Sequence, residues 1–397
     1  MKKTAAWLVR HALEQIGVSY TFGIPGVHNI ELYDELRESD SILPLLVTHE
    51  GGASFMADAM YRASGQIGVL VVVPAAGLTH AMSGIGEAFL DGIPMLVISG
   101  GVRTDMSQGF QLHDVDQQAL MRPLTKATFK VESYDEVVAT VYRAWRVAME
   151  GEPGPVYIEV PANLQLLAGE SGPIPPFEPE LPRPELDAEA VAEAAQLLLS
   201  ARKPGLFVGW GARHVTEDLQ RIAERLGAPV ATTLQGLASF PGDHPLHTGM
   251  GYGPSAVPAA RRAFSDCDVM LAVGTRFAEI CTGSYGAVPP DTLVHIDINP
   301  AAIGRNYPAT VAIAADARDA VPALAEALID NAPEGAAPQP DWAPLAESIA
   351  EDKAAWRAEW MAHDSKGRVN PGRFFAAFRE RLDDDAILVA CLLYTSD

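Results

Sequence analysis

Cysteine is scarce in this sequence of 397 residues, which holds only Cys267, Cys281 and Cys391, without CxxC spacing. That scarcity excludes a disulfide framework and a zinc knuckle, and a reducing cytoplasm is the expected compartment. Long hydrophobic runs are absent too, and none reaches the length that a membrane-spanning helix requires. Arg10 and His11 interrupt the amino-terminal segment, which therefore suits an amphipathic helix better than a signal peptide.

Positive charge is also in short supply. Lys and Arg number 29 against 51 Asp and Glu, so the formal net charge is −22. Such an acidic chain is a poor partner for nucleic acid or for an anionic membrane surface. With 48% hydrophobic residues, the chain has the material for two or three packed domains. We therefore expect an enzyme that acts on small molecules, without a nucleic-acid or membrane partner.

Strand-like and helix-like stretches alternate along the first part of the chain. Ile67–Val73 and Pro94–Ser99 are nearly continuous apolar runs, as in strands that are buried on both faces. Apolar residues recur at helical spacing over Thr79–Leu90 and Tyr134–Met149. This repeated βα alternation predicts an α/β fold in which helices wrap a parallel sheet.

Proline-rich segments divide the chain. Residues 168–186 are rich in proline, which removes backbone donors and favours an extended linker. A second α/β pattern follows over 187–330, then a linker over 331–342, helical material to about Arg381 and a strand at Ala386–Ala390. The final residues, CLLYTSD, do not continue the pattern. We expect two doubly wound parallel-sheet domains and, over 343–397, the truncated start of a third.

One carboxylate stands where an apolar strand meets a helix. Glu50 follows the strand-like run Leu45–Thr48, and the two glycines after it keep side chains away. Helical spacing predicts a helix from about Ala53 to Ser64, closed by Gly65. A Glu in this place could exchange a proton with a flat heterocycle, or it could be a solvated residue that caps the helix.

Nine short motifs follow one another along the chain. They are FGIPG at 22–26, THEGGASFMADAMYRASG at 48–65, GLTHAMSGIGEAFLDGIPMLVISG at 77–100, FQ at 110–111, DVD at 114–116, RPLTK at 122–126, GPVYIEVP at 154–161, GTRF at 274–277 and HIDINP at 295–300. In this order and spacing the chain resembles the thiamine-diphosphate-dependent enzymes related to the acetolactate synthase large subunit. The resemblance covers essentially Met1 to Ala390. It implies a pyrimidine-binding domain over 1–167, a central dinucleotide-fold-like domain over 187–330, and the beginning of a diphosphate-binding domain.

The resemblance also implies a cofactor site. Glu50 is the glutamate expected to face the N1′ atom of the aminopyrimidine ring and to promote ionisation of the thiazolium carbon. His80 takes the place of an Asn in a loop that is usually richer in glycine, so it is either a cofactor contact or a residue at the helix start. The residues expected to hold thiamine diphosphate are Pro25, Gly26, Glu50, Gly77, Thr79 and His80.

Two residues are implied on the substrate side. Gln111 is the expected catalytic hydrogen-bond donor to the substrate or intermediate, and Lys126 is expected to stabilise an anionic substrate. Each could instead be a solvated or helix-capping residue. Leu112 and His113 look like a two-residue insertion in the loop that shapes the substrate side, which bears on the identity of the 2-oxo acid.

A second cofactor is suggested for the central domain. Acetolactate synthases bind FAD there in a structural role, whereas many relatives with this domain bind no flavin. The glycine turn near Gly211 lacks a full GxGxxG pattern. The residues that could contact FAD are Gly211, Gly249, Met250, Gly274, Arg276, Asp297 and Asp316.

The Mg²⁺ ligands of the family, a Gly-Asp-Gly run and a later Asn, belong to the third domain and do not occur in this sequence. No metal ligand is therefore named, and this chain alone is expected to be inactive. The implied activity is decarboxylation and carboligation of a 2-oxo acid, pyruvate to acetolactate, in branched-chain amino-acid synthesis. The implied partners are a second copy, as homodimer or homotetramer, and a regulatory subunit. Two alternatives stay open: another carboligase, decarboxylase or acyltransferase of the family, and a non-catalytic remnant that binds a complete relative.

Overall fold

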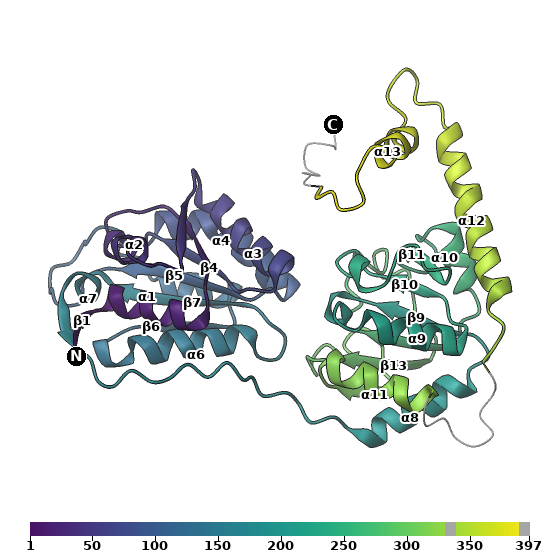
Figure 1. The fold of residues 1–397 in the computed structure, drawn as a ribbon, viewed down its shortest axis with the longest axis horizontal. Coiled ribbons are helices and arrows are strands. Elements are labelled where there is room, and N and C mark those ends of the chain that lie inside the picture. The colour runs from purple at the N-terminus through teal and green to yellow at the C-terminus, as the bar shows by residue number, and fades with distance from the viewer. Residues whose placement is uncertain (330–338, 389–397) are drawn as a thin grey trace. The chain divides into compact units, whose positions relative to one another are not determined.

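The computed structural model describes residues 1–329 and 339–388 (Figure 1). The chain separates into two compact units, Met1–Arg183 and the part that begins at Pro184. Each unit is built around a six-stranded sheet in which neighbouring strands are parallel. This confirms the predicted α/β class with two parallel-sheet domains.

The first unit has the strand order β3-β2-β4-β5-β7-β6. The two central strands β4 and β5 are buried along their whole length, because their continuous apolar sequences leave no polar face. The strands are β2 (Tyr20–Gly23), β3 (Leu43–Leu46), β4 (Gly68–Val72), β5 (Met95–Gly101), β6 (Ala127–Lys130) and β7 (Pro155–Pro161).

Helices cover both faces of this sheet (Figure 1). On one face α1 (Ala5–Ile16) packs against α6 (Val137–Met149) and α2 (Ile30–Arg37). On the other face α3 (Glu50–Ser64) packs against α4 (Ala76–Asp91). Short helical segments connect these elements: α5 (Gln117–Met121), α7 (Ala162–Leu166) and the 3-10 turns η1 (Arg122–Leu124) and η2 (Tyr134–Glu136).

Helices α3 and α4 pack closely against each other and are joined by ion pairs. A Cβ atom on Gly84 would lie 2.4 Å from Oγ of Ser54, so only glycine lets α4 approach α3 here. At the far end, the guanidinium of Arg62 in α3 donates to Asp91 at 2.8 Å and to Asp58 at 2.7 Å. These contacts fix the two helices that carry Glu50 and His80.

Helix α3 begins earlier than the sequence predicted. His49 is its N-cap, with the imidazole Nδ1 accepting from the backbone N–H of Gly51 at 3.0 Å, and Gly65 ends the helix at a φ of 74°. Glu50 is therefore the first residue of the helix rather than part of the preceding loop. A carboxylate at this position is favoured by the helix dipole.

The proline-rich stretch is partly docked. Strand β8 (Ala168–Glu170), at its start, pairs antiparallel with β1 (Lys2–Thr4). Ile174, Phe177 and Leu181 then pack against the core of the first unit, and the ring of Phe177 meets that of Trp145 edge-on at 4.8 Å between centroids. The segment predicted as a linker over 168–186 is thus, for much of its length, part of the surface of the first unit.

The second unit repeats the parallel design with the order β11-β10-β9-β12-β13-β14. Its helices α8 (Ala188–Ser200), α9 (Thr216–Leu226) and α11 (Ala317–Ile329) bury one face of the sheet in a shared core. The other face packs against an aromatic cluster that includes Tyr252, Phe264 and Phe277. The strands are β9 (Pro204–Val208), β10 (Val230–Thr232), β11 (His247–Met250), β12 (Val269–Val273), β13 (Thr292–Asp297) and β14 (Val311–Ala314).

Smaller elements complete the second unit. The turns η3 (Trp210–Ala212) and η4 (Leu237–Ser239) follow strands, and α10 (Pro258–Ala263) packs against α12 (Ala343–Ala362), where Arg262 pairs with Asp352 at 3.0 Å. The helical prediction after Ala343 is confirmed by α12 and α13 (Pro371–Arg379).

The strand predicted at Ala386–Ala390 is not seen in Ala386–Leu388, which are irregular, and its last two residues lie outside the described part. The segment CLLYTSD likewise lies outside it. None of the helices in the described part of the chain combines the length and apolar character that a bilayer crossing requires.

Candidate functional site

The first sheet has one point where its connections diverge. Strands β2 and β4 are neighbours, but β2 leads to β3 on one side and β4 leads to β5 on the other. In parallel α/β sheets, ligands bind outside the carboxyl ends of the strands at such a point. The loops that leave β2 and β4 contain Pro25, Gly26 and the residues just before Gly77.

Two glycines line this point with bare backbone. A Cβ atom on Gly26 would lie 2.4 Å from Cγ1 of Val73, and one on Gly77 would lie 2.8 Å from Cγ2 of the same Val73. The first loop is pinned by Asn29, whose side chain accepts from Gly26 N–H at 2.6 Å and donates to the carbonyl of Ile24 at 3.2 Å. Larger side chains at either glycine would disrupt this cradle.

Glu50 lies beside this cradle and is 8% exposed. Its Oε1 lies 3.2 Å from the position that a Cβ of Gly77 would take, and its Oε2 is 3.1 Å from Nδ1 of His80. The His80 ring stacks on that of His49, with centroids 5.1 Å apart. The carboxylate is therefore held between the start of α3, the backbone of α4 and an imidazole, in a geometry suited to proton exchange with a ligand.

Tyr33 is a second ionisable side chain near Glu50. Its hydroxyl donates to the carbonyl oxygen of Val71 at 2.9 Å. Burial, and then the nearby charge of Glu50, raises the pKa of Tyr33, so the phenol stays protonated. Gly23 makes room for this contact, because a Cβ there would lie 1.9 Å from the same carbonyl oxygen.

The loop after β4 carries backbone strain at a residue that is not glycine. Ala75, the N-cap of α4, has a φ of 54°. Side chains with a Cβ adopt this region at a cost, and such residues concentrate at functional sites. Thr79, in the first turn of α4, is exposed and donates its hydroxyl to the carbonyl of Ala76 at 3.0 Å. The predicted cofactor residues therefore come together around one strained turn.

The predicted substrate residues do not join this group. The amide of Gln111 accepts from the N–H of Arg103 at 3.1 Å and donates to the carbonyl of Arg103 at 2.9 Å, which closes the loop after β5 on itself. Contact with a substrate would require that amide to leave both bonds.

Lys126 lies at the wrong edge of the sheet for the predicted substrate contact. It immediately precedes β6, whereas Glu50 follows its strand, so the length of a four-residue strand, roughly 13 Å, separates the two edges. Its ammonium donates to the carbonyl of Glu150 at 2.6 Å, and burial lowers the pKa of Lys126. The structure therefore does not bring Lys126 together with Glu50.

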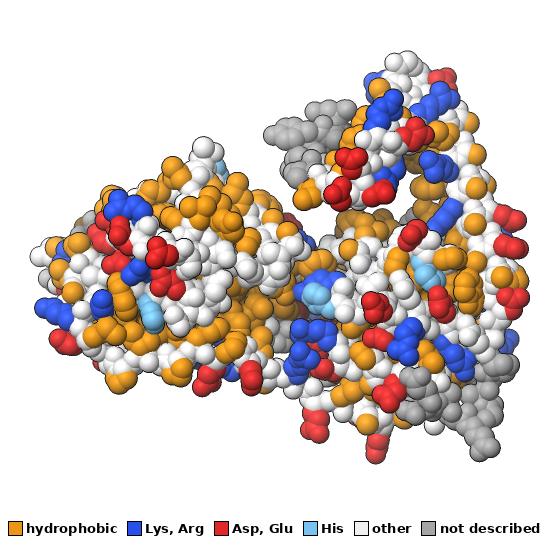
Figure 2. Space-filling model, viewed as in Figure 1, with side chains coloured by type: hydrophobic (Ala, Val, Ile, Leu, Met, Phe, Trp, Pro, Cys, Tyr) orange, Lys and Arg blue, Asp and Glu red, His pale blue; other side chains and the backbone are white. Residues whose placement is uncertain are grey.

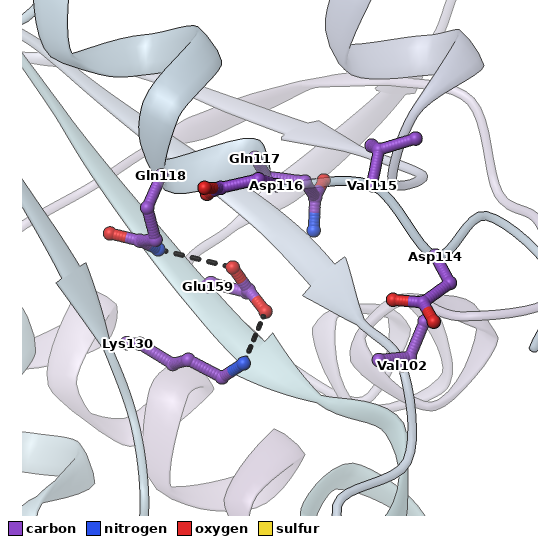
Figure 3. A pocket seen from close by; sticks show the side chains of 8 residues that line it. All are labelled: Val102, Asp114, Val115, Asp116, Gln117, Gln118, Lys130 and Glu159. Carbon is purple, nitrogen blue, oxygen red and sulfur yellow. Dashed lines mark hydrogen bonds and ion pairs between the residues drawn. The ribbon is translucent and has the colours of Figure 1, made fainter. Parts of the chain in front are cut away.

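Sequence reasoning missed a second polar group at the carboxyl edge. Glu159, in β7, accepts from the Lys130 ammonium at 3.2 Å and from the Gln118 amide at 3.1 Å (Figure 3). It is a buried charge in an otherwise apolar strand, and that pattern was the available signal. These residues line a cavity of about 290 Å³ together with Val102, Asp114, Val115, Asp116 and Gln117.

In the second unit, the residues suggested for FAD gather at the carboxyl edge. They lie at or just after β9, β11, β12, β13 and β14, around the point between β9 and β12 where the connections diverge. The backbones of Gly211 and Gly274 touch, however: a Cβ on Gly274 would lie 2.6 Å from Cα of Gly211. These glycines serve loop-to-loop packing and leave no room between them for a pyrophosphate. Among residues 1–329 and 339–388, no three His, Cys, Asp or Glu side chains are grouped to hold a metal ion.

Comparison with known protein families places both units. The model described as "Thiamine pyrophosphate enzyme, N-terminal TPP binding domain" matches residues 3–120, which include the Glu50 cluster. The model described as "Thiamine pyrophosphate enzyme, central domain" matches residues 191–324. Each match falls inside one of the two α/β units.

Curated relatives agree with these matches. A probable acetolactate synthase large subunit of Methanocaldococcus jannaschii is 36% identical over 327 residues, 80% of this chain and 55% of the relative. The acetolactate synthase of Mycobacterium bovis is 34% identical over 346 residues, 85% of this chain and 56% of the relative. The large subunit of acetolactate synthase isozyme 2 of Escherichia coli is 34% identical over 329 residues, which are 82% of this chain and 59% of the relative. The chain thus spans little more than half the length of these relatives.

Proposed function

Because this chain belongs to the thiamine pyrophosphate enzyme family, of which it carries the N-terminal and central domains, we propose that it serves an acetolactate synthase. The reaction is decarboxylation of pyruvate and transfer of the remaining fragment to a second 2-oxo acid. The observation that carries the proposal is the Glu50–His80 pair beside the bare backbone of Gly77. It lies inside the segment that the N-terminal domain family matches.

The residues at this site fit an aminopyrimidine ring. Gly26 and Gly77 let the loops after β2 and β4 pack closely against Val73, and Glu50 offers a carboxylate beside Gly77. When bound, thiamine diphosphate supplies a thiazolium carbon that adds to the 2-oxo acid and accepts the electrons released with CO₂. Pro25, in the loop after β2, and Thr79, in the first turn of α4, are both exposed.

In this proposal the residues of this chain hold and orient a proton at the cofactor ring. Glu50 holds a proton at the ring nitrogen through one carboxylate oxygen, while His80 binds the other oxygen and fixes the carboxylate plane. Tyr33, whose phenol stays protonated, lies close enough to Glu50 to be affected by its charge. Burial of Glu50 keeps water from competing for the proton.

The test uses the protein as its source DNA encodes it. Glu50→Gln keeps the shape of the side chain but cannot exchange a proton, so it should lower the rate of acetolactate formation from pyruvate about 10²–10⁴-fold. Glu180→Gln, an exposed change, should leave the rate intact. Acetolactate is measured as acetoin after acid treatment. A rate of acetolactate formation in Glu50→Gln within about twofold of wild type would contradict the role of this carboxylate.

Product analysis separates the alternatives. Turnover of other 2-oxo acids or aldehydes, without acetolactate, would favour another carboligase of the family. A protein that binds a complete relative and forms no product would be the non-catalytic remnant. A regulatory subunit and a place in branched-chain amino-acid synthesis stay predictions, as does Mg²⁺ bound with the diphosphate.

FAD is a separate proposal, supported only by the gathering of residues at the carboxyl edge of the second sheet. The contact between Gly211 and Gly274 disfavours a pyrophosphate between those loops, so no step of the reaction is assigned to a flavin. Titration of the chain with FAD, followed by flavin fluorescence, tests it. Arg276→Ala should weaken binding, whereas the exposed Arg305→Ala should not.

Self-association is supported by an apolar surface. Figure 2 shows hydrophobic side chains gathered on the face of the first unit formed by α3 and α4, where Phe55, Met56, Phe89 and Leu90 are exposed. Contiguous exposed apolar side chains mark association surfaces. We therefore include a homodimer or homotetramer in the proposal. Sedimentation equilibrium of Phe55→Glu, which should dissociate the assembly, tests this surface.

A further inference from the structure

Two exposed histidine rings lie together where α3 and α4 begin. His49 is the N-cap of α3, and His80 lies near the start of α4. Their ring centroids are 5.1 Å apart and their planes are inclined by 24°, so the two rings are stacked. The proposed function uses His80 to orient Glu50 and gives no role to His49.

The backbone of α3 decides which nitrogen of His49 carries a proton. Nδ1 of His49 accepts from the backbone N–H of Gly51 at 3.0 Å, so it holds no hydrogen of its own. A Cβ on Gly51 would lie only 3.0 Å from the same nitrogen, so glycine leaves room for this bond. Protonation of Nδ1 would break the N-cap. As long as the N-cap bond is kept, His49 therefore presents an uncharged ring, with its hydrogen on Nε2, to the ring of His80.

His80 connects a buried oxygen to the surface. Its Nδ1 is 3.1 Å from Oε2 of Glu50, and the Glu50 side chain is 11% exposed against 54% for His80. An ionised carboxylate only accepts, so Nδ1 of His80 must donate to it. The other nitrogen of the ring, Nε2, then has a lone pair with which it can take a proton from outside.

Other titratable groups around this pair can be named from each neighbouring element. Helix α2 supplies Tyr33, whose pKa is raised by burial and then by the charge of Glu50, so its phenol stays protonated. The turn before α3 supplies His49, and on α4 the next carboxylate is Glu87, two turns beyond His80. Within the part of the chain that the structure describes, Glu50 is the carboxylate that bonds His80. Proton exchange with His80 is therefore directed to Glu50.

The kind of side chain at position 80 adds a chemical ability. The related enzymes were expected to carry an Asn here, and an amide can hydrogen-bond a carboxylate but cannot take up or release a proton near neutral pH. An imidazole can do both, because one nitrogen can accept a proton while the other releases one. His80 therefore offers Glu50 more than a hydrogen bond.

We propose that His80 relays protons between Glu50 and solvent, and that His49 holds the His80 ring in the orientation that the relay requires. The relay rests on the proposed function, in which Glu50 exchanges a proton with the cofactor ring. His80 acts through Glu50 and needs no contact of its own with the cofactor, so it is a positioning residue.

The protons balance in each direction of the relay. When Glu50 releases a proton from one carboxyl oxygen, its Oε2 takes the Nδ1 proton of His80, and a water molecule or a buffer acid gives a proton to Nε2. The carboxyl group and the imidazole end with the charges that they had before, and the external donor becomes hydroxide or the buffer base. The reverse transfer, when the proton returns to Glu50, restores the Nδ1–H form of His80.

Nuclear magnetic resonance of the ring nitrogens tests the geometry without cofactor. In the 397-residue chain, isotopically labelled in its imidazoles at pH 8, His80 should be the Nδ1–H tautomer and His49 the Nε2–H tautomer. Glu50→Ala removes the acceptor and should return His80 to the Nε2–H form, which the exposed His363 shows throughout. An Nε2–H tautomer of His80 in the wild-type chain would overturn the relay.

A variant of His49 tests the supporting ring. His49→Asn keeps an acceptor for the N-cap of α3 but removes the stacked ring. It should give His80 a mixture of both tautomers, while the signal of the buried His295 stays in place and reports an intact fold. An unchanged tautomer of His80 in His49→Asn would show that the stack does not hold the ring.

Kinetics test the relay itself in the protein as its source DNA encodes it. His80→Asn keeps a hydrogen-bond donor for Glu50 but cannot relay, so it should slow acetolactate formation about tenfold at low buffer concentration. Added imidazole should restore part of that rate and leave the wild-type rate unchanged, and His363→Asn should follow wild type. A wild-type rate in His80→Asn at low buffer concentration would overturn the relay.

The two proposals fail in different ways. If Glu50→Gln is slow and His80→Asn is as fast as wild type, the relay fails and the proposed function stands. If Glu50→Gln keeps the wild-type rate, the proposed function fails at this carboxylate and the relay fails with it. The tautomers of His49 and His80 are measured in either case, because they do not depend on cofactor or turnover.

Discussion

At the scale of single residues, Ala75 bears the strain of the loop after β4, with a φ of 54°. Glycine adopts this conformation without a Cβ penalty, so Ala75→Gly should raise the free energy of unfolding by about 1 kcal/mol. Urea denaturation of the chain measures the change. As a control, Ala59→Gly, at an exposed position inside α3, should lower stability by about 1 kcal/mol. A loss of stability in Ala75→Gly would show that the conformation carries no strain.

The described cysteines are expected to be unreactive. Burial, and then the charge of Asp268, raises the pKa of the Cys267 thiol to about 12, and burial also raises the pKa of Cys281. Thiolate, not thiol, attacks alkylating reagents. Iodoacetamide at pH 8 should therefore modify Cys267 and Cys281 only after denaturation, as read by peptide mass mapping, which reports each cysteine separately. Alkylation of either one in the folded chain at the rate of the denatured chain would contradict the burial.

At the scale of elements, the crossing of the β2 loop over β5 depends on Gly100. A Cβ there would meet the carbonyl oxygen of His28 at 1.8 Å, so Gly100→Ala must displace the loop that carries both Gly26 and His28. We expect a loss of about 2 kcal/mol or more in the free energy of unfolding, since overpacking against backbone has no easy relief. Gly109→Ala, where no heavy atom lies within 4 Å, is the control and should be close to neutral.

The elements with a strong pattern were predictable. The buried runs of β4 and β5 and the helices α4 and α6 lie where the sequence placed them, because continuous apolar runs and helical spacing persist in the fold. Strands β11 and β14 give no clear signal in the sequence, since HTGM has no apolar pattern and VAIA is only four residues long. The start of α3 was placed late because histidine is an uncommon N-cap and gives no signal in the sequence.

The candidate site was predictable to the same extent. Glu50, Gly77 and His80 come together because each follows or begins an element at the carboxyl edge, which strand order alone indicates. Lys126 does not join them, because the motif that suggested it precedes its strand. His49 gave no signal, since its contact with His80 joins turns far apart in the sequence. Motifs identify the residues of a family, whereas contacts between distant loops require the fold.

At the scale of the whole molecule, buried histidines link stability to pH. Burial lowers the pKa of His247 and His295 below the usual value of 6.5, so the folded chain holds their protons less well than the unfolded chain does. Their stabilising contribution is complete above pH 6.5 and is lost as the pH falls toward the folded pKa. Acidification from pH 7.5 to 5.5 should therefore destabilise the second unit by about 1 kcal/mol for each residue.

A variant isolates this effect from that of the carboxylates. His295→Gln can still donate to the carbonyl of Thr275, which the Nε2–H of His295 meets at 2.8 Å, but it cannot titrate. Between pH 7.5 and 5.5 it should lose about 1 kcal/mol less stability than wild type in urea denaturation. The exposed His363→Gln should follow wild type. Equal losses in wild type and His295→Gln would mean that His295 takes up its proton without unfolding.

The antiparallel pairing of β1 with β8 has a consequence for protein engineering. Lys2 pairs with Glu170 and Thr4 with Ala168, so the two ends of residues 1–170 lie side by side. Domains with adjacent ends tolerate circular permutation and insertion into the loops of host proteins. Residues 1–170, whose first and last strands pair, could therefore be transplanted as a cassette with short joints at either end. Any ligand that binds such a module would then stabilise the protein that received it.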